Sequence, residues 1–220
     1  MISTIEDAIK LCKNEVILKG VLSELNIDVR RTSDNDITLT YKGVVDVNDS
    51  YISFYGRVSN GSSMFTSVAK ELNALESEIK TESEDGEVVD TSYSNKASRI
   101  YMHGGIISPN SIRADYISAS TLHPSFLAHI VGVYLGKYDD IDRILIINPY
   151  YHNIIHVKCD GDYSKLINKT VCVDMNISPY NEDMPPIGVV DIYKASEQIS
   201  PNVIDQAKLE HDIYLESMSK

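Results

Sequence analysis

Three pairs of an aromatic and a basic residue lie close together in segments that alternate between polar and apolar side chains. The pairs are Tyr41 with Lys42, Tyr55 with Arg57, and Arg99 with Tyr101. Bases of a single-stranded nucleic acid stack on aromatic rings while Lys or Arg contacts the phosphates, so this combination is typical of single-strand binding faces. We expect the pairs to form such a face on successive strands. The alternative is that the three tyrosines are ordinary surface residues of a barrel.

No other group of residues predicts chemistry. His152 and His156 are four residues apart in an expected strand, and no third metal ligand accompanies them. The carboxylates cluster in turn segments, where solvation is their usual role. Gly104 and Gly105 follow a strand and predict a bulge or turn rather than a phosphate-binding loop. We therefore expect no catalytic residue, no metal site and no cofactor, and predict a binding protein rather than an enzyme.

The net charge of the chain is -12, which sets a condition on any nucleic-acid ligand. An acidic surface repels a phosphate backbone, so the charge opposes the general, basic kind of DNA-coating protein. It leaves room for a local groove of Lys and Arg on an acidic molecule. The 220 residues are enough for one large or two small domains, each with a hydrophobic core.

Cysteine usage and hydropathy indicate the compartment. The three cysteines lack CxxC spacing, which favours free thiols in a reducing environment. No apolar run is long enough to span a membrane, and the N-terminus has the pattern of a polar, capped helix rather than a signal peptide. We expect a cytoplasmic protein that does not contact membranes.

The first half of the chain reads as five strands with two helices. Ser3 and Glu6 fit a capping box for a short N-terminal helix that ends near Asn14. Gly20 is a candidate bulge in the first strand. The predicted strands cover residues 15–30, 37–47, 51–58, 98–108 and 112–118, with a helix at 65–79 and an acidic surface loop at 80–96 between the third and fourth strands.

The second half repeats this order after a break at His123 and Pro124. The predicted strands cover residues 126–138, 143–151, 154–160, 170–177 and 187–193, with a short helical piece at 164–168 between the third and fourth. A final helix begins at Pro201 with Ser200 as its cap. Five strands with a helix between the third and fourth is the element order of the OB-fold.

The predicted fold class is therefore mainly β with short helices. It consists of two tandem OB-like Greek-key barrels plus N- and C-terminal helices. The first barrel covers residues 1–122 with the N-terminal helix and the acidic loop. The second, smaller barrel covers residues 123–220 with the C-terminal helix.

Several segments also resemble a known group of proteins. The runs ILKGVLSELNIDVR and ITLTYKGVV, the segment RIYMHGGIISPNSI and the closing ISPNVIDQAKLEHDIYLESM are similar to bacteriophage and prophage OB-fold proteins that bind single-stranded DNA during replication. The similarity lies in the order of these segments and in their general residue character, and it extends over most of the chain. It implies a single-stranded-DNA ligand and no catalytic residues.

We thus expect a single-stranded-DNA-binding protein of phage or prophage origin that acts in replication or recombination inside an infected or lysogenic bacterial cell. Other replication or host proteins, and further copies of the chain, are expected as additional partners. The alternative is an acidic phage interaction protein that binds a host or phage protein as an inhibitor, DNA mimic or assembly subunit. The charge of -12 favours this alternative.

Overall fold

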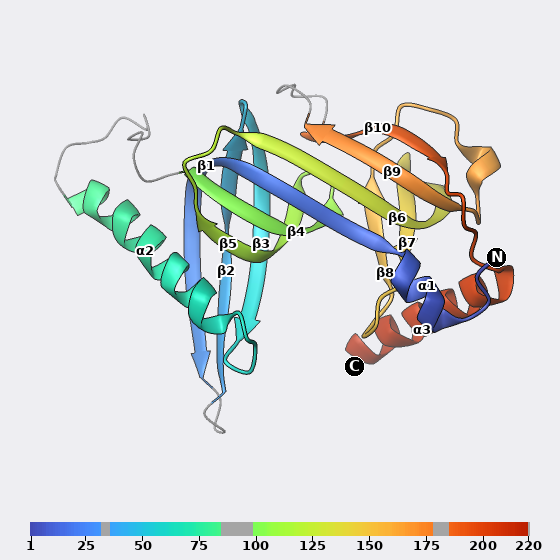
Figure 1. The fold of residues 1–220 in the computed structure, drawn as a ribbon, viewed down its shortest axis with the longest axis horizontal. Coiled ribbons are helices and arrows are strands. Elements are labelled where there is room, and N and C mark those ends of the chain that lie inside the picture. The colour runs from blue at the N-terminus through green and yellow to red at the C-terminus, as the bar shows by residue number, and fades with distance from the viewer. Residues whose placement is uncertain (32–35, 85–98, 178–184, 220) are drawn as a thin grey trace.

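The computed structural model describes residues 1–31, 36–84, 99–177 and 185–219, which form a mainly β structure (Figure 1). Three α-helices accompany ten strands and one 3-10 turn in this part of the chain. In chain order the elements are α1 (Ile5–Leu11), β1 (Lys13–Arg31), β2 (Ile37–Val47), β3 (Ser50–Ser59), α2 (Phe65–Glu84), β4 (Arg99–Ser108), β5 (Ser111–Ala119), β6 (Ser125–Tyr138), β7 (Ile141–Ile146), β8 (Asn153–Val157), η1 (Ser164–Leu166), β9 (Thr170–Ile177), β10 (Ile187–Lys194) and α3 (Pro201–Met218).

The first five strands close into a ring. β1, β2, β3, β5 and β4 pair in that order, and β4 pairs back onto β1. All of these pairings are antiparallel except the parallel pairing of β3 with β5. α2 packs against β5 and β3 and buries Val68, Leu72 and Leu75 in the core. The ring, with a helix between its third and fourth strands, has the element order that was predicted for the first half.

Alternation along β3 separates the inside of this ring from its outside. Ile52, Phe54 and Val58 are buried, and the residues between them, other than Gly56, are exposed. The β2–β3 hairpin turns at Asn48 and Asp49, whose φ angles of 53° and 66° are those of a type I′ turn. This turn has the right-handed twist of the strands it joins, so it holds the register of the β2–β3 face.

The second half has the same strand order. β8, β7, β6, β9 and β10 are neighbours in that sequence, as β3, β2, β1, β4 and β5 are in the first ring. In the described residues, β8 and β10 form no ladder, and a backbone hydrogen bond of 3.3 Å from Val189 N–H to Lys158 O joins the two segments. A closed second barrel therefore stays a prediction.

The two halves are joined through strand pairing. β1 pairs with β6 from Lys13 to Lys19, across the predicted boundary at 122/123, so all ten strands belong to one sheet. A backbone hydrogen bond of 2.9 Å from Ile187 N–H to Pro109 O adds a second link. The division into two domains is still a prediction.

Some local predictions were wrong in detail. α1 is capped by Thr4 rather than Ser3, because the Thr4 side chain accepts a hydrogen bond from Asp7 N–H at 3.2 Å. The irregularity in β1 lies after Leu22 and not at Gly20, which instead sits too close to β2 for any side chain. The predicted bulge at Gly104 is confirmed.

The helices also differ in length from their predictions. α2 continues to Glu84, so residues 80–84 of the predicted loop are helical, and the rest of that loop lies outside the described residues. α3 begins at Pro201 after the cap Ser200, as predicted. Within the described ranges, no helix is both long and apolar enough to cross a membrane.

Candidate nucleic-acid interface

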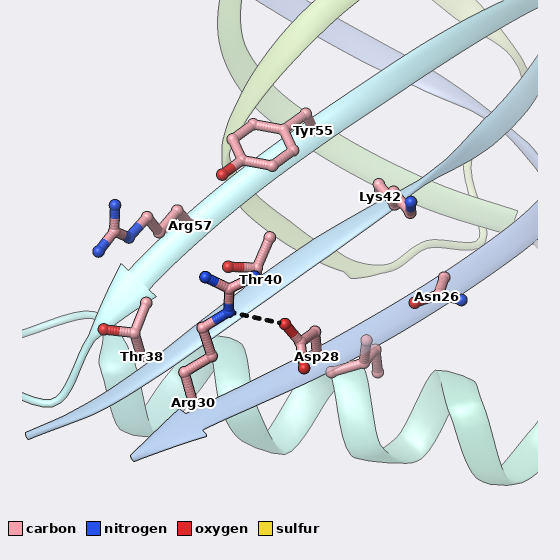
Figure 2. A pocket seen from close by; sticks show the side chains of 9 residues that line it. Asn26, Asp28, Arg30, Thr38, Thr40, Lys42, Tyr55 and Arg57 are labelled. Atoms are coloured by element: carbon pink, nitrogen blue, oxygen red, sulfur yellow. Dashed lines mark hydrogen bonds and ion pairs between the residues drawn. The ribbon is translucent and has the colours of Figure 1, made fainter. Parts of the chain in front are cut away.

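The outer face of the first ring carries an open groove of about 530 Å³ (Figure 2). Three neighbouring strands, the second half of β1 with β2 and β3, supply its floor. The lining residues are Asn26, Ile27, Asp28, Arg30, Thr38, Thr40, Lys42, Tyr55 and Arg57. Most of them are polar and point outward because they alternate with the buried residues of the core.

Strand register brings the groove residues together in rows. Asn26 pairs with Lys42, and Lys42 pairs with Tyr55. Cross-strand partners on one face have Cβ atoms about 5 Å apart, so Lys42 and Tyr55 are direct neighbours on this face, with the Tyr55 ring directed toward Arg57 in Figure 2. Arg57 is two residues further along β3 on the same face, as Figure 2 shows. An aromatic ring and two cations therefore share one open surface.

A second groove of about 530 Å³ continues this face. It shares Asn26, Lys42 and Tyr55 with the first groove and extends to Ser53 and to Ser111 at the start of β5. The β4–β5 connection is held in place here, because Ser53 N–H donates to Asn110 O at 3.0 Å. The two grooves together form a continuous track across the ring.

The first groove is locally basic although the chain carries a net charge of -12. Its charged residues are three cations and one carboxylate, Asp28, which pairs with Arg30 at 3.1 Å. Among the residues that the structure describes, neither Lys42 nor Arg57 has an ion-pair partner. These two cations are therefore available to phosphate oxygens.

Arg113 adds a further cation that the sequence analysis missed. The parallel pairing of β3 with β5 places it beside Tyr55. Its guanidinium donates to Asp115 at 2.7 and 2.9 Å, and these hydrogen bonds raise the pKa of Arg113 above its ordinary value. The alternation of residues 112–118 shows that Arg113 faces outward. The residues around Arg113 in the sequence do not show that its strand, β5, pairs with β3.

Of the six predicted binding residues, the structure brings Lys42, Tyr55 and Arg57 together. Tyr41 requires a correction. Its ring is fully buried inside the ring of strands, and its hydroxyl donates to Ala114 O at 2.8 Å, so it cannot stack on a base. The reason is the two-residue period of a strand, which sends Tyr41 inward if Lys42 faces outward.

Arg99 and Tyr101 lie elsewhere on the ring. Both are half-buried on β4, which β5 separates from β3, and neither lines the grooves on the β2–β3 face. The Tyr101 ring meets Tyr116 edge-on, with the centroids 6.3 Å apart. Contact of Arg99 and Tyr101 with nucleic acid stays a prediction, and it would occur at a place outside the two grooves.

In the second half, the corresponding face is covered. β7 is buried on both sides, since Ile144 and Leu145 point in opposite directions and are both fully buried. Lys208 and His211 of α3 line a small cleft of about 250 Å³ with Arg143 of β7. His211 Nδ1 donates to the His152 backbone oxygen at 2.7 Å, which fixes the helix there. The open face is thus the one on the first ring.

The two histidines considered as metal ligands, His152 and His156, lie in different surroundings. His152 is buried and its Nε2 atom pairs with Glu210 at 2.8 Å, whereas His156 is exposed. Within the described part of the chain, no three His, Cys, Asp or Glu side chains are close enough to hold a metal ion.

Comparison with solved structures shows a structural likeness, whereas comparison with protein families and curated proteins shows none. No protein-family model and no curated protein matches this chain. Among solved structures, the wild-type single-stranded DNA binding protein from Thermus aquaticus is similar, with a TM-score of 0.46 and 10% sequence identity over 86% of this chain and 96% of that chain.

Proposed function

We propose that this protein binds single-stranded DNA on the β2–β3 face of its first ring. The observation that supports this most is the open surface shared by Tyr55, Lys42 and Arg57, on which both cations lack a carboxylate partner within the described residues. A base stacks on the Tyr55 ring, and the two cations contact the phosphates on either side. The protein acts as a binder and not as an enzyme.

The chemistry of the face predicts moderate affinity with a strong dependence on salt. One stacked base contributes about 1–3 kcal/mol. Each neutralised phosphate of a single strand contributes roughly 0.7 to the slope of log affinity against log salt. Asn26, Thr38 and Thr40 supply amide and hydroxyl groups for hydrogen bonds to sugars and bases.

In this proposal the chain comprises two OB-like barrels in tandem. The first holds the strand and the second is closed on its corresponding face by α3. A phage or prophage origin, and a role in replication or recombination inside the bacterial cell, are part of the same proposal and rest on the sequence resemblance.

Fluorescence anisotropy with a labelled single strand and the matching duplex, at low and physiological salt, tests the proposal. We expect preferential binding of the single strand, weakened by salt. The double variant Lys42→Ala/Arg57→Ala should lower the salt slope by about 1.4, for two lost phosphate contacts. The variant Lys165→Ala/Lys194→Ala removes the same charge from exposed sites of the second half and should bind normally. Equal loss in both variants, or no binding at low salt, would rule out the assigned face.

An acidic interaction protein is the second candidate. It is favoured by the net charge of -12 and by exposed apolar residues near the end of α3. These are Leu209, Ile213, Leu215 and Met218. Absence of single-strand binding together with capture of a defined partner by the intact protein would favour this candidate.

A further inference from the structure

Beyond the groove, the row of side chains on the first ring leads toward the second half. Arg113 follows Tyr55 across the parallel β3–β5 pairing. Tyr151 lies in the connection between β7 and β8. β5 pairs with β4, with Arg113 opposite Gly105, and β4 packs against β8, the strand that follows Tyr151. β4 therefore links the strand that carries Arg113 to the end of the connection that carries Tyr151.

An exposed aromatic surface is formed by this connection and α3. The rings of Tyr151 and Tyr214 are stacked, with centroids 5.3 Å apart and an angle of 12° between the planes. They are 42% and 38% exposed, and the neighbouring Tyr150 is 94% exposed. A cleft of about 150 Å³ adjoins all three rings. In Figure 1 the C-terminal end of α3, which carries Tyr214, is the end nearer to the first ring.

We propose that a single strand filling the groove continues past Arg113 and stacks a further base on the surface formed by Tyr150, Tyr151 and Tyr214. This inference rests on the proposed function and names a second contact area for the same ligand. The phosphate between the two areas meets Arg113. A guanidinium has five N–H donors, so Arg113 keeps Asp115 as a partner while it binds that phosphate.

The charges around the aromatic surface determine which part of the nucleotide faces it. Glu210 already accepts hydrogen bonds from His152 and Gln206, both at 2.8 Å, while Asp212 and Glu216 are exposed on α3. These carboxylates repel phosphate, so the sugar–phosphate chain stays on the Arg113 side and the base points toward the rings. Stacking tolerates any base because every base presents a π-face.

The stacked pair also has a simpler interpretation, in which Tyr151 only helps to hold α3 in place. Two observations favour a binding surface. Tyr150 is 94% exposed, so it contributes almost nothing to the packing of the chain. Tyr151 and Tyr214 each remain more than one third exposed although their rings stack on each other. Strand length separates the two interpretations, because only a strand that spans both areas can use the second one.

The experiment compares a short oligothymidylate of about five nucleotides with one of about 30, within and beyond the site size of one barrel. The variant Tyr150→Ala/Tyr151→Ala should bind the short strand like wild type and the long strand about fivefold or more weakly. Tyr55→Ala should weaken binding of both strands. Tyr151→Phe keeps the stacked ring and should bind like wild type. Tyr193→Ala is the control on β10, because Tyr193 has a similar exposure of 44%.

Thermal melting shows whether each variant keeps its fold, and Tyr150→Ala alone serves as the test if the double variant melts early. If wild type binds both strands and the tyrosine variants match it on the long one, the second contact area is refuted and the groove stands. If wild type binds neither strand, the proposed function and this inference are both overturned.

Discussion

Tyr41 and Lys42 are adjacent in β2 and lie on opposite sides of it. The Tyr41 hydroxyl donates to Ala114 O at 2.8 Å inside the ring, whereas Lys42 is the cross-strand partner of Tyr55 on the outer face. Tyr41→Phe should therefore lower the free energy of unfolding by about 0.5–1.5 kcal/mol, because it removes a buried hydrogen bond between β2 and β5. Urea denaturation measures this change. Single-strand affinity should not change, and a loss of affinity at unchanged stability would place Tyr41 in the binding face after all.

The Asp28–Arg30 pair limits the positive charge of the groove. Asp28→Asn removes the partner of the Arg30 guanidinium, now 3.1 Å away, and leaves a further cation for phosphate. We expect single-strand affinity at low salt to rise by about two- to fivefold, the scale of one exposed ion pair. Anisotropy titrations at several salt concentrations should also show a steeper slope. Asp49→Asn, in the β2–β3 turn, is the control for loss of a negative charge.

Closure of the ring depends on close backbone approach at Gly56. A Cβ atom at this position would collide with the Tyr41 ring and with Ala114 O, neither of which can move without opening the ring. Gly56→Ala should therefore destabilise the protein by about 1–3 kcal/mol. Gly61→Ala is the matched control, because a Cβ atom there meets nothing within 4 Å. Denaturant midpoints compare the two variants, and equal stability would contradict the observed packing of β3 against Tyr41.

The buried thiols predict instability in alkali. Burial raises the pKa of Cys12 from 9.0 to about 11, and burial with the nearby Asp142 raises that of Cys159 to about 12. The folded state thus retains thiol protons that the unfolded chain releases. This contribution is fully present below pH 9 and is lost as the pH rises toward 11 and 12, by up to about 1.4 kcal/mol per pH unit for each thiol.

Unfolding free energies from pH 8 to 11 test this slope, with Cys12→Ala/Cys159→Ala as the comparison. The double variant should show a shallower decline than wild type. Identical pH profiles would mean that the two thiols titrate alike in the folded and unfolded states.

Much of the local structure was predictable from residue patterns. The period of two in β2 and β3 identified the strands, and the aromatic–basic pairs within them led to Lys42, Tyr55 and Arg57. The same pairs also led to Tyr41, which points inward. Asn48 and Asp49, which lie between the two predicted strands, tolerate positive φ and form the hairpin turn. Pro201 after Ser200 marked the start of α3. These features depend on neighbours within a few residues, so the sequence by itself determined them.

Tertiary structure alone decided which outward-facing residues meet. The β3–β5 pairing joins Tyr55 to Arg113, 58 positions apart by their numbers, and placed Arg99 and Tyr101 on another strand, away from the groove. The packing of α3 closed the second half's face, and β1 joined the halves by pairing with β6. Long-range pairing follows from the summed burial of many side chains and the closure of one hydrogen-bonded ring. A short window of sequence cannot predict this pairing, because the side chains involved are far apart along the chain.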